Sequence, residues 1–189
     1  SLTHSSGASL TLTYNAAGRL SQLTDSTGRV VAFTYDASGE HLTGVAGPRG
    51  TTAYTYNAQH ALLSVTYPSG VQQHFEYDAR GRLSREYYAG YAEAVAYTYP
   101  GPGRVTLTDA LGAETSLWFN AVGQLGQVRD PLGHITRLGY DASYELTRLT
   151  LPNGAYYVYG YDAWGNLTDR VDPLGQRLAL TYAPGTNRL

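Results

Sequence analysis

Large apolar residues alternate with small or polar ones in short segments along the chain. In one such segment Phe33 is followed by Thr34 and then by Tyr35. A period of two sends alternate side chains to opposite faces of a β-strand, so one face of each segment is predicted to be apolar and covered and the other largely solvated. The apolar position two residues before a recurring aromatic is held by Phe33, Tyr54, Phe75, Tyr97, Leu117, Leu138, Tyr159 and Leu180.

The recurring aromatic defines an internal repeat. Its copies follow one another at intervals of 21, 21, 21, 22, 20, 21, 21 and 21 residues. A fixed period of this length indicates a tandem array in which each copy is one small structural unit. The copies stand at Tyr14, Tyr35, Tyr56, Tyr77, Tyr99, Phe119, Tyr140, Tyr161 and Tyr182.

Each repeat carries two turn signals. An Asp or Asn follows the aromatic in most copies, and a glycine that can adopt positive φ closes this first turn. A second signal, such as Asp130-Pro-Leu-Gly133, comes about ten residues later and has the preferences of a type I turn. Two turns in about 21 residues leave two strands of roughly 5–7 residues, joined as hairpins. The glycines of the first turn are Gly18, Gly39, Gly81, Gly123 and Gly165.

The second strand of the unit departs from strict alternation. Leu20 and Leu23 are both apolar but three residues apart, and the same spacing recurs in later copies. This spacing predicts a β-bulge or a strand edge between them. A helix would give the same spacing, but six to eight residues between turns are too few for one. The predicted fold class is all-β, with antiparallel hairpins in a long, curved and spiralling sheet.

The pattern resembles the YD repeat of the Rhs family, whose unit begins Tyr-Asp-x-x-Gly-Arg-Leu. The segments 14–25, 77–83 and 161–175 match that unit most closely, and the match extends over the whole of 1–189, which is predicted to be a single repeat array. The family includes bacterial Rhs polymorphic toxins, the C component of Tc toxins, and teneurins. The resemblance implies a β-ribbon wound into a hollow shell, which in the bacterial members encloses a C-terminal toxin.

Several copies depart from the pattern. His60 and Tyr144 stand where the turn glycine is expected, and Glu40-His41 adds a residue before Leu42. The stretch 86–93 lacks the second turn signal, so one irregular hairpin is predicted there. The family's self-cleavage segment is absent, and Asp130-Pro-Leu-Gly133, which shares letters with it, falls in register with the ordinary turns.

Composition narrows the function classes. Hydrophobic residues make up 42% of the chain, charged residues 15%, and the net charge is −2, so neither a disordered tail nor a nucleic-acid partner is indicated. The absence of Cys excludes a disulfide framework. No apolar run is long enough for a membrane span, and no signal peptide is visible. The absence of Met predicts that the chain is a piece of a longer protein.

Candidate chemistry is sparse. The five histidines show no metal-ligand spacing, so no metal site is predicted, and the carboxylates are mostly turn formers. No nucleophile elbow occurs. The sequence therefore predicts no catalytic residue and no cofactor, and the chain is not expected to be an enzyme. The histidines are His4, His41, His60, His74 and His134.

The main hypothesis is a non-catalytic shell segment that encloses or scaffolds a toxin domain for delivery. Its expected partners are other shell segments and the toxin domain of the same parent, together with secretion-apparatus proteins, and exposed sheet edges would allow self-association. The expected location is exported or on a bacterial cell surface. The alternative is a carbohydrate-binding or adhesion module, because exposed rings stack on sugars. Six aromatic residues lie off the main apolar stripe: Tyr87, Tyr88, Tyr91, Trp118, Tyr144 and Trp164.

Overall fold

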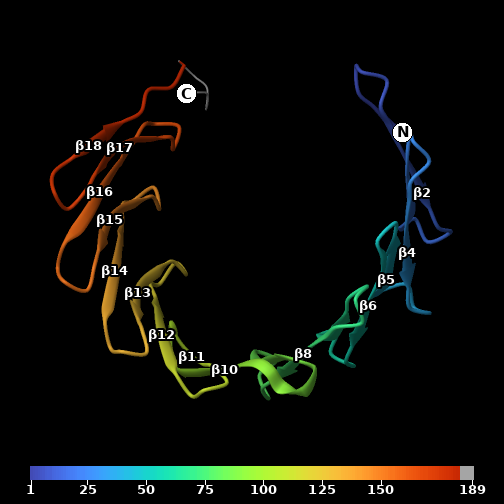
Figure 1. Cartoon of the computed structure of the whole chain (residues 1–189), viewed down its shortest axis with the longest axis horizontal. Helices are drawn as coiled ribbons and strands as arrows, with labels where there is room; N and C mark the ends of the chain where they lie inside the picture. The colour runs from blue at the N-terminus through green and yellow to red at the C-terminus, as the bar shows by residue number, and fades with distance from the viewer. Residues whose placement is uncertain (184–189) are drawn as a thin grey trace. The chain divides into compact units, whose positions relative to one another are not determined.

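Strands make up nearly all of the regular structure in residues 1–183, which the computed structural model describes apart from the side chain of Ala92 (Figure 1). This confirms the predicted all-β class. The chain divides into two compact units, Ser1–Ala96 and Tyr97–Leu189. Within the described residues, no helix is long and apolar enough to cross a membrane.

The first unit is a run of short strands, mostly five to seven residues long, as predicted. A single 3₁₀ turn, η1 (Ala89–Tyr91), interrupts it before β10 (Ala92–Gly101), which continues into the second unit. The strands before this turn are β1 (Leu2–Thr3), β2 (Ser9–Tyr14), β3 (Leu20–Asp25), β4 (Val30–Tyr35), β5 (Leu42–Gly47), β6 (Gly50–Tyr56), β7 (Leu62–Thr66), β8 (Gln72–Tyr77) and β9 (Leu83–Tyr88).

The second unit repeats the same arrangement. Its strands after β10 are β11 (Arg104–Thr108), β12 (Glu114–Phe119), β13 (Leu125–Arg129), β14 (Ile135–Tyr140), β15 (Leu146–Thr150), β16 (Tyr156–Tyr161), β17 (Leu167–Val171) and β18 (Arg177–Ala179).

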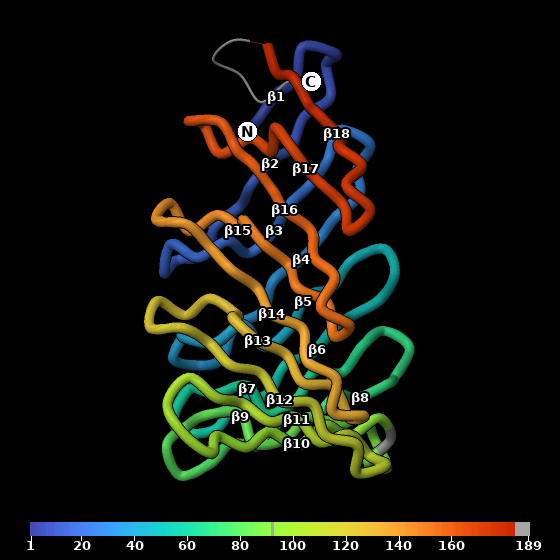
Figure 2. The backbone as a smooth tube through the Cα atoms, turned by 90° about the vertical axis from the view of Figure 1, so that its left-hand side faces the viewer, coloured from blue at the N-terminus to red at the C-terminus, as the bar shows by residue number. Residues whose placement is uncertain are grey.

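Strands pair antiparallel in chain order, so each unit is a meander of hairpins (Figure 2). Leu12 lies opposite Leu23, and Leu23 lies opposite Val31. Residues opposite one another share a face, so this register lines up the apolar positions of successive strands. In the second unit Leu138 lies opposite Leu149, which lies opposite Tyr157. The predicted apolar stripe therefore exists in both units.

A β-bulge recurs at the same place in the repeat. Thr13 lies opposite Gln22 while the next residue, Tyr14, lies opposite Leu20, which leaves Ser21 as the extra residue. The bulge brings Leu20 and Leu23 to the same face although they are three residues apart, as the spacing predicted. The same shift follows Thr34, Thr55, Glu76, Trp118, Gly139 and Gly160.

The turns have the hydrogen bonds of three-residue hairpin loops that end in a left-handed glycine. The Gly133 N–H donates to the carbonyl of Asp130 (2.9 Å), and the Asp130 N–H donates to the carbonyl of His134 (3.0 Å). Asp130 Oδ1 also accepts from the N–H groups of Leu132 and His134. Gly133 has φ of +87°. Aspartate is thus a turn former here, as its register predicted.

His60 and Tyr144 keep the backbone conformation of the glycines that they replace. Their φ angles are +63° and +68°. A side chain in this region costs roughly 1–2 kcal/mol, because Cβ approaches the following carbonyl oxygen. The repeat geometry therefore overrides the preference of these two residues, and both turns are strained.

The irregular hairpin predicted at 86–93 is confirmed. Tyr91 and Glu93 have φ of +60° and +52°, in place of an ordinary turn. The pairing of β10 with β9 shifts register between Ala92 and Val95. Without the Asp-x-x-Gly signal the chain reverses through the 3₁₀ turn and a bulge.

The prediction of a covered apolar face is only partly correct. Phe33, Phe75 and Leu138 are half-buried, and Val65 is the only hydrophobic residue of the described part that is more than nine-tenths buried. Within residues 1–183 each unit is a single layer of sheet, with no second layer over the stripe. The accessible surface is 12505 Å², whereas a compact monomer of 20.4 kDa exposes about 8,800 Å².

The opposite face is also less uniformly solvated than predicted. Thr106 and Ser116 lie on it with exposures of 6% and 7%, and their hydroxyl oxygens are 3.1 Å apart. The guanidinium of Arg104 lies 4.9 Å from the ring centre of Trp118 on the same face. A long arginine and an indole thus cover the small hydroxyl residues between them.

Relief of turn strain gives a stability test. Replacing Tyr144, which is 62% exposed, by glycine should raise the free energy of unfolding by about 0.5–1 kcal/mol, because the lost strain exceeds the entropy that glycine adds to the unfolded chain. The matched control is Gly123→Ala at the same turn position, where φ is +83° and the added Cβ would meet no atom within 4 Å. That variant should be destabilised by a similar amount. Urea unfolding measures both, and a destabilised Tyr144→Gly variant would contradict the strain assignment.

Candidate functional site

The repeat tyrosines make one contact that recurs through both units. In the first unit the Tyr35 hydroxyl donates to the carbonyl of Leu20 at 2.8 Å. The acceptor is the leucine beside the bulge of the preceding repeat, so the bond connects one hairpin to the next. Equivalent bonds join Tyr56 to Leu42 (2.9 Å), Tyr77 to Leu62 (2.8 Å), Tyr140 to Leu125 (3.0 Å) and Tyr161 to Leu146 (2.9 Å).

We call these five hydrogen bonds the tyrosine junctions. Burial raises the pKa of Tyr56, Tyr77 and Tyr161 above the ordinary value for a phenol. A protonated hydroxyl can donate to a carbonyl, whereas a phenolate cannot. These three hydroxyls therefore remain hydrogen-bond donors at neutral pH.

Phe119 has no hydroxyl, and its repeat is joined through the main chain. The Phe119 N–H donates to the carbonyl of Gly103 at 2.6 Å. A Cβ atom at Gly103 would lie 2.6 Å from the Phe119 carbonyl oxygen, so only glycine allows this close approach. In this repeat a main-chain hydrogen bond therefore joins neighbouring strands where other repeats use a tyrosine hydroxyl.

The turn carboxylates are held ionised by local donors. The hydroxyl of Thr27, followed by the N–H of Arg29, lowers the pKa of Asp25 far below its ordinary value. The pKa of Asp78 is lowered first by the side chain of Arg82, whose Nε donates to Oδ2 at 2.8 Å. These groups fix turns and point to no acid–base chemistry.

A second contact recurs along the edge where the first turns lie. At Arg19, His41 and Gln124, the residue before the repeat leucine reaches toward the next repeat. Arg19 lies with its guanidinium 5.7 Å from the ring centre of Tyr35, and Gln124 Nε2 donates to the carbonyl of Tyr144 at 2.9 Å. Neighbouring turns are thus joined by side chains of varying chemistry.

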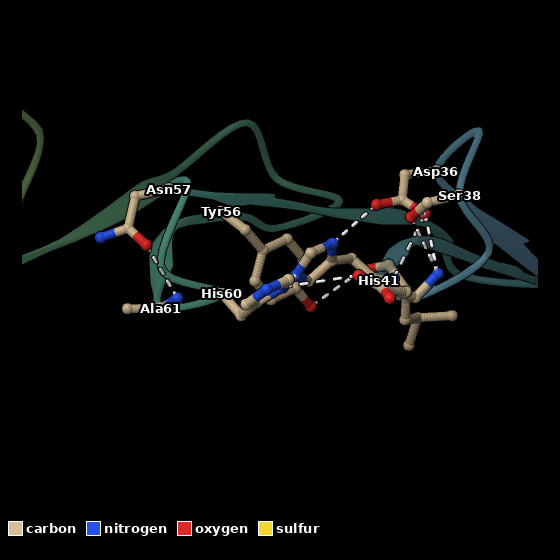
Figure 3. Close-up of polar contacts among 9 residues, drawn as sticks. Asp36, Ser38, His41, Tyr56, Asn57, His60 and Ala61 are labelled. Carbon is tan, nitrogen blue, oxygen red and sulfur yellow. Dashed lines mark hydrogen bonds and ion pairs between the residues drawn. The ribbon is translucent and has the colours of Figure 1, made fainter.

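At the contact between the turns 36–41 and 57–61, the joining residues are histidines (Figure 3). His41 Nε2 lies 2.9 Å from His60 Nδ1, and His60 Nδ1 lies 3.7 Å from Glu40 Oε2. The ligand atoms of all three residues lie within 4.8 Å of one another. His41 also faces the ring of Tyr56, with centroids 4.5 Å apart. We call Glu40, His41 and His60 the histidine cluster.

The sequence prediction of no metal site did not consider this cluster. Metal ligands on one strand or helix are a few residues apart, whereas His41 and His60 are 19 residues apart. The useful signal was the repeat itself, because equivalent positions of successive repeats lie side by side. Gln124 and Tyr144, which make the corresponding contact, are 20 residues apart.

The aromatic residues proposed for sugar stacking differ in their exposure and contacts. Trp118 lies against Arg104, while Tyr87 and Tyr88 are half-buried. Tyr87 stacks on both His74 and Tyr91, with ring centroids 5.1 Å and 4.5 Å apart. The most exposed rings are Tyr91 (59%), Tyr144 (62%) and Trp164 (70%). Of these, Tyr144 and Trp164 lie in the first turns of two successive repeats of the second unit.

The other predicted repeat residues lie where the pattern placed them. The aromatics end the strands β2, β4, β6, β8, β12, β14 and β16, while Tyr99 lies within β10 and Tyr182 follows β18. The first-turn glycines all have positive φ, between +74° and +83°. Their role as structural residues remains a prediction that mutation can test.

Two family models match the chain. The Teneurin YD-shell model matches residues 2–87, and the RHS Repeat model matches residues 119–156 and 145–177. None of the curated proteins compared with the chain matches it.

Solved structures of Tc toxin proteins are similar to this chain, and one with a TM-score of 0.50 shares its fold. A TcdB2-TccC3-TEV crystal structure is 19% identical with a TM-score of 0.50, and TcdB2-TccC3 without its hypervariable C-terminal region is 21% identical with a score of 0.46. The Tc holotoxin pore of Photorhabdus luminescens is 19% identical, also with a score of 0.46. Each match covers 95% of this chain but only 10% of the other, so the chain spans about a tenth of the length of these proteins.

Removal of one junction hydroxyl tests its contribution. Tyr140→Phe should lower the free energy of unfolding by about 1 kcal/mol, because the half-buried carbonyl of Leu125 loses its donor. Tyr14→Phe is the control, since this ring is 57% exposed and its hydroxyl makes no such bond within residues 1–183. It should change stability by less than about 0.5 kcal/mol. Equal effects of the two substitutions in urea unfolding would contradict the role of the junction.

The turn carboxylates predict how stability depends on pH. Their folded pKa lies below the ordinary value of 3.8, so the stability that they contribute is present above that value and is lost as pH falls through it. The thermal midpoint should therefore change little between about pH 5 and 7 and fall below about pH 4. In Asp78→Asn this acid decline should be shallower. An unchanged decline would show that other groups cause the acid sensitivity.

Proposed function

Because the chain belongs to the YD-shell/RHS repeat family, we propose that it forms part of the wall of a toxin shell that encloses a C-terminal toxin domain. In this function the chain provides a structural surface and catalyses no reaction. The tyrosine junctions and edge contacts hold successive hairpins together, and the array of 1–189 extends the wall repeat by repeat.

The observation that carries the proposal is the half-exposed apolar stripe of each unit. A single-layer sheet cannot cover its own apolar face, and exposed patches of this kind mark surfaces that contact something else. Leu10, Leu178 and Tyr14 remain 43%, 47% and 57% exposed. A wall with an enclosed domain or further shell segments against one face would supply the missing cover.

The proposal has consequences for partners and location. The end strands β1 and β18 each offer a sheet edge that further shell segments of the parent would continue. The toxin domain is the expected cargo, and secretion-apparatus proteins are the expected delivery partners, which places the parent outside the cytoplasm or on the cell surface. The chain itself carries no catalytic role and no cofactor in this account.

The alternative function, carbohydrate binding, rests on Tyr144 and Trp164. Their rings are the most exposed aromatics of the second unit and stand in successive turns at one edge. Stacking on two sugar rings would need such a pair. Binding to a glycan array that is lost in Trp164→Ala would support this function, whereas unchanged or absent binding would count against it.

Cysteine labelling tests the wall directly, because the chain has no cysteine of its own. Leu138→Cys and Arg137→Cys place thiols at adjacent positions of β14 on opposite faces. In the parent protein freed of other cysteines, a polymer-linked maleimide should label one position at least about tenfold more slowly than the other, since one face of a wall is enclosed.

The isolated chain is the matched control for this measurement. Both thiols should react with the large reagent there, because neither face is covered by a second layer. A small maleimide should reach both positions in the parent once it is unfolded. Equal labelling of both faces in the folded parent by the large reagent would contradict enclosure.

A further inference from the structure

We propose that the histidine cluster binds one Zn²⁺ ion, with His41 Nε2, His60 Nδ1 and a carboxylate oxygen of Glu40 as ligands. The ion would bridge the turns 36–41 and 57–61 of neighbouring repeats. This site is independent of the proposed shell function, since it requires only the local fold of the first unit.

Two departures from the repeat pattern meet at the histidine cluster. His41 belongs to a turn lengthened by one residue, and His60 replaces a glycine at φ of +63°. Either change alone would be ordinary drift of a repeat. Both fall on turns that are neighbours along the same edge, and a residue held in a strained backbone position calls for a functional explanation.

The second argument is the chemistry of the donors. Two imidazoles and a carboxylate form a ligand set that Zn²⁺ uses with three protein ligands and a fourth position open to water. Mg²⁺ and Ca²⁺ prefer oxygen ligands only, so this set selects against them. The side chains of Glu40 and His60 are 59% and 64% exposed, which gives an ion a direct path from solvent.

The third argument is the orientation of His41. Its Nδ1 lies 2.6 Å from Asp36 Oδ2. A carboxylate can only accept, so Nδ1 carries the proton and the Nε2 lone pair points toward His60. A carboxylate behind a histidine ligand fixes its tautomer and its ring in metal sites generally. The Tyr56 ring restrains the other side.

The distances fit after a small adjustment. Zn–N bonds in a tetrahedral site separate two ligand nitrogens by about 3.3 Å. The His41–His60 nitrogens are 2.9 Å apart, joined by a hydrogen bond whose proton the ion would replace. Opening this gap by a few tenths of an ångström requires only a rotation of the exposed His60 side chain. Glu40 Oε2 lies 3.7 Å from His60 Nδ1, and the ligand atoms of all three residues lie within 4.8 Å of one another, so the exposed Glu40 side chain would move inward to complete the set.

The test is a Zn²⁺ titration of the 189-residue chain, prepared without a histidine tag and freed of metal with a chelator. Competition with a chromophoric zinc indicator should show one saturable site, and added Zn²⁺ should raise the thermal midpoint. Co²⁺ alone should give the intense visible absorption of a tetrahedral site. His60→Gly should abolish all three signals while the chain still folds, because glycine is the ordinary residue of this turn.

Two further variants separate a built site from chance binding. Asp36→Asn should weaken Zn²⁺ binding about 10–100-fold, as expected of a residue that orients a ligand. His134→Asn is the matched control, because His134 contacts Asp130 at 2.9 Å in the same manner but is not part of the histidine cluster. It should bind Zn²⁺ as the unaltered chain does. Absence of one-to-one binding, or binding that survives His60→Gly, would overturn the proposal.

Discussion

A hydrogen bond from the repeat tyrosine to the carbonyl of a leucine one repeat earlier joins successive hairpins at Tyr35, Tyr56, Tyr77, Tyr140 and Tyr161. Its acceptor lies beside the bulge, and the bulge also turns two leucines three residues apart to one face. A change of repeat length would move the hydroxyl away from its carbonyl unless the turn absorbed it. The extra residue at Glu40-His41 leaves the interval from Tyr35 to Tyr56 at 21 residues, and Tyr56 still reaches Leu42 at 2.9 Å.

The structure tolerates variation at turns and at one junction while the antiparallel pairing of the strands is kept. Left-handed backbone persists at His60 and Tyr144 although neither residue favours it. The junction at Phe119 lost its hydroxyl and is made instead by a main-chain bond that only Gly103 permits. Backbone strain occurs in the turns at the sheet edge, where the side chains vary between repeats. The strands between the turns keep their register. The variable edge is also where the histidine cluster arose.

Much of the fold was predictable because the same strand and turn pattern recurs in nine copies of the repeat. Alternation, turn residues and the spacing of Leu20 and Leu23 each specified a feature that the structure confirms. The degree of burial was not predictable from pattern alone, since alternation shows which face is apolar but not whether a second layer covers it. The contact of His41 with His60 was missed for another reason: it depends on pairing between repeats, and the inserted residue hid the usual spacing.

In the proposed toxin shell, the chain is a piece of wall whose apolar face and sheet edges are completed by the rest of its parent. A cryo-EM structure of the intact parent is the most direct measurement of that claim. It should show further strands hydrogen-bonded to the outer edges of β1 and β18, with one face of the sheet turned toward an enclosed volume. End strands left open to solvent, or both faces of the sheet fully exposed, would contradict it.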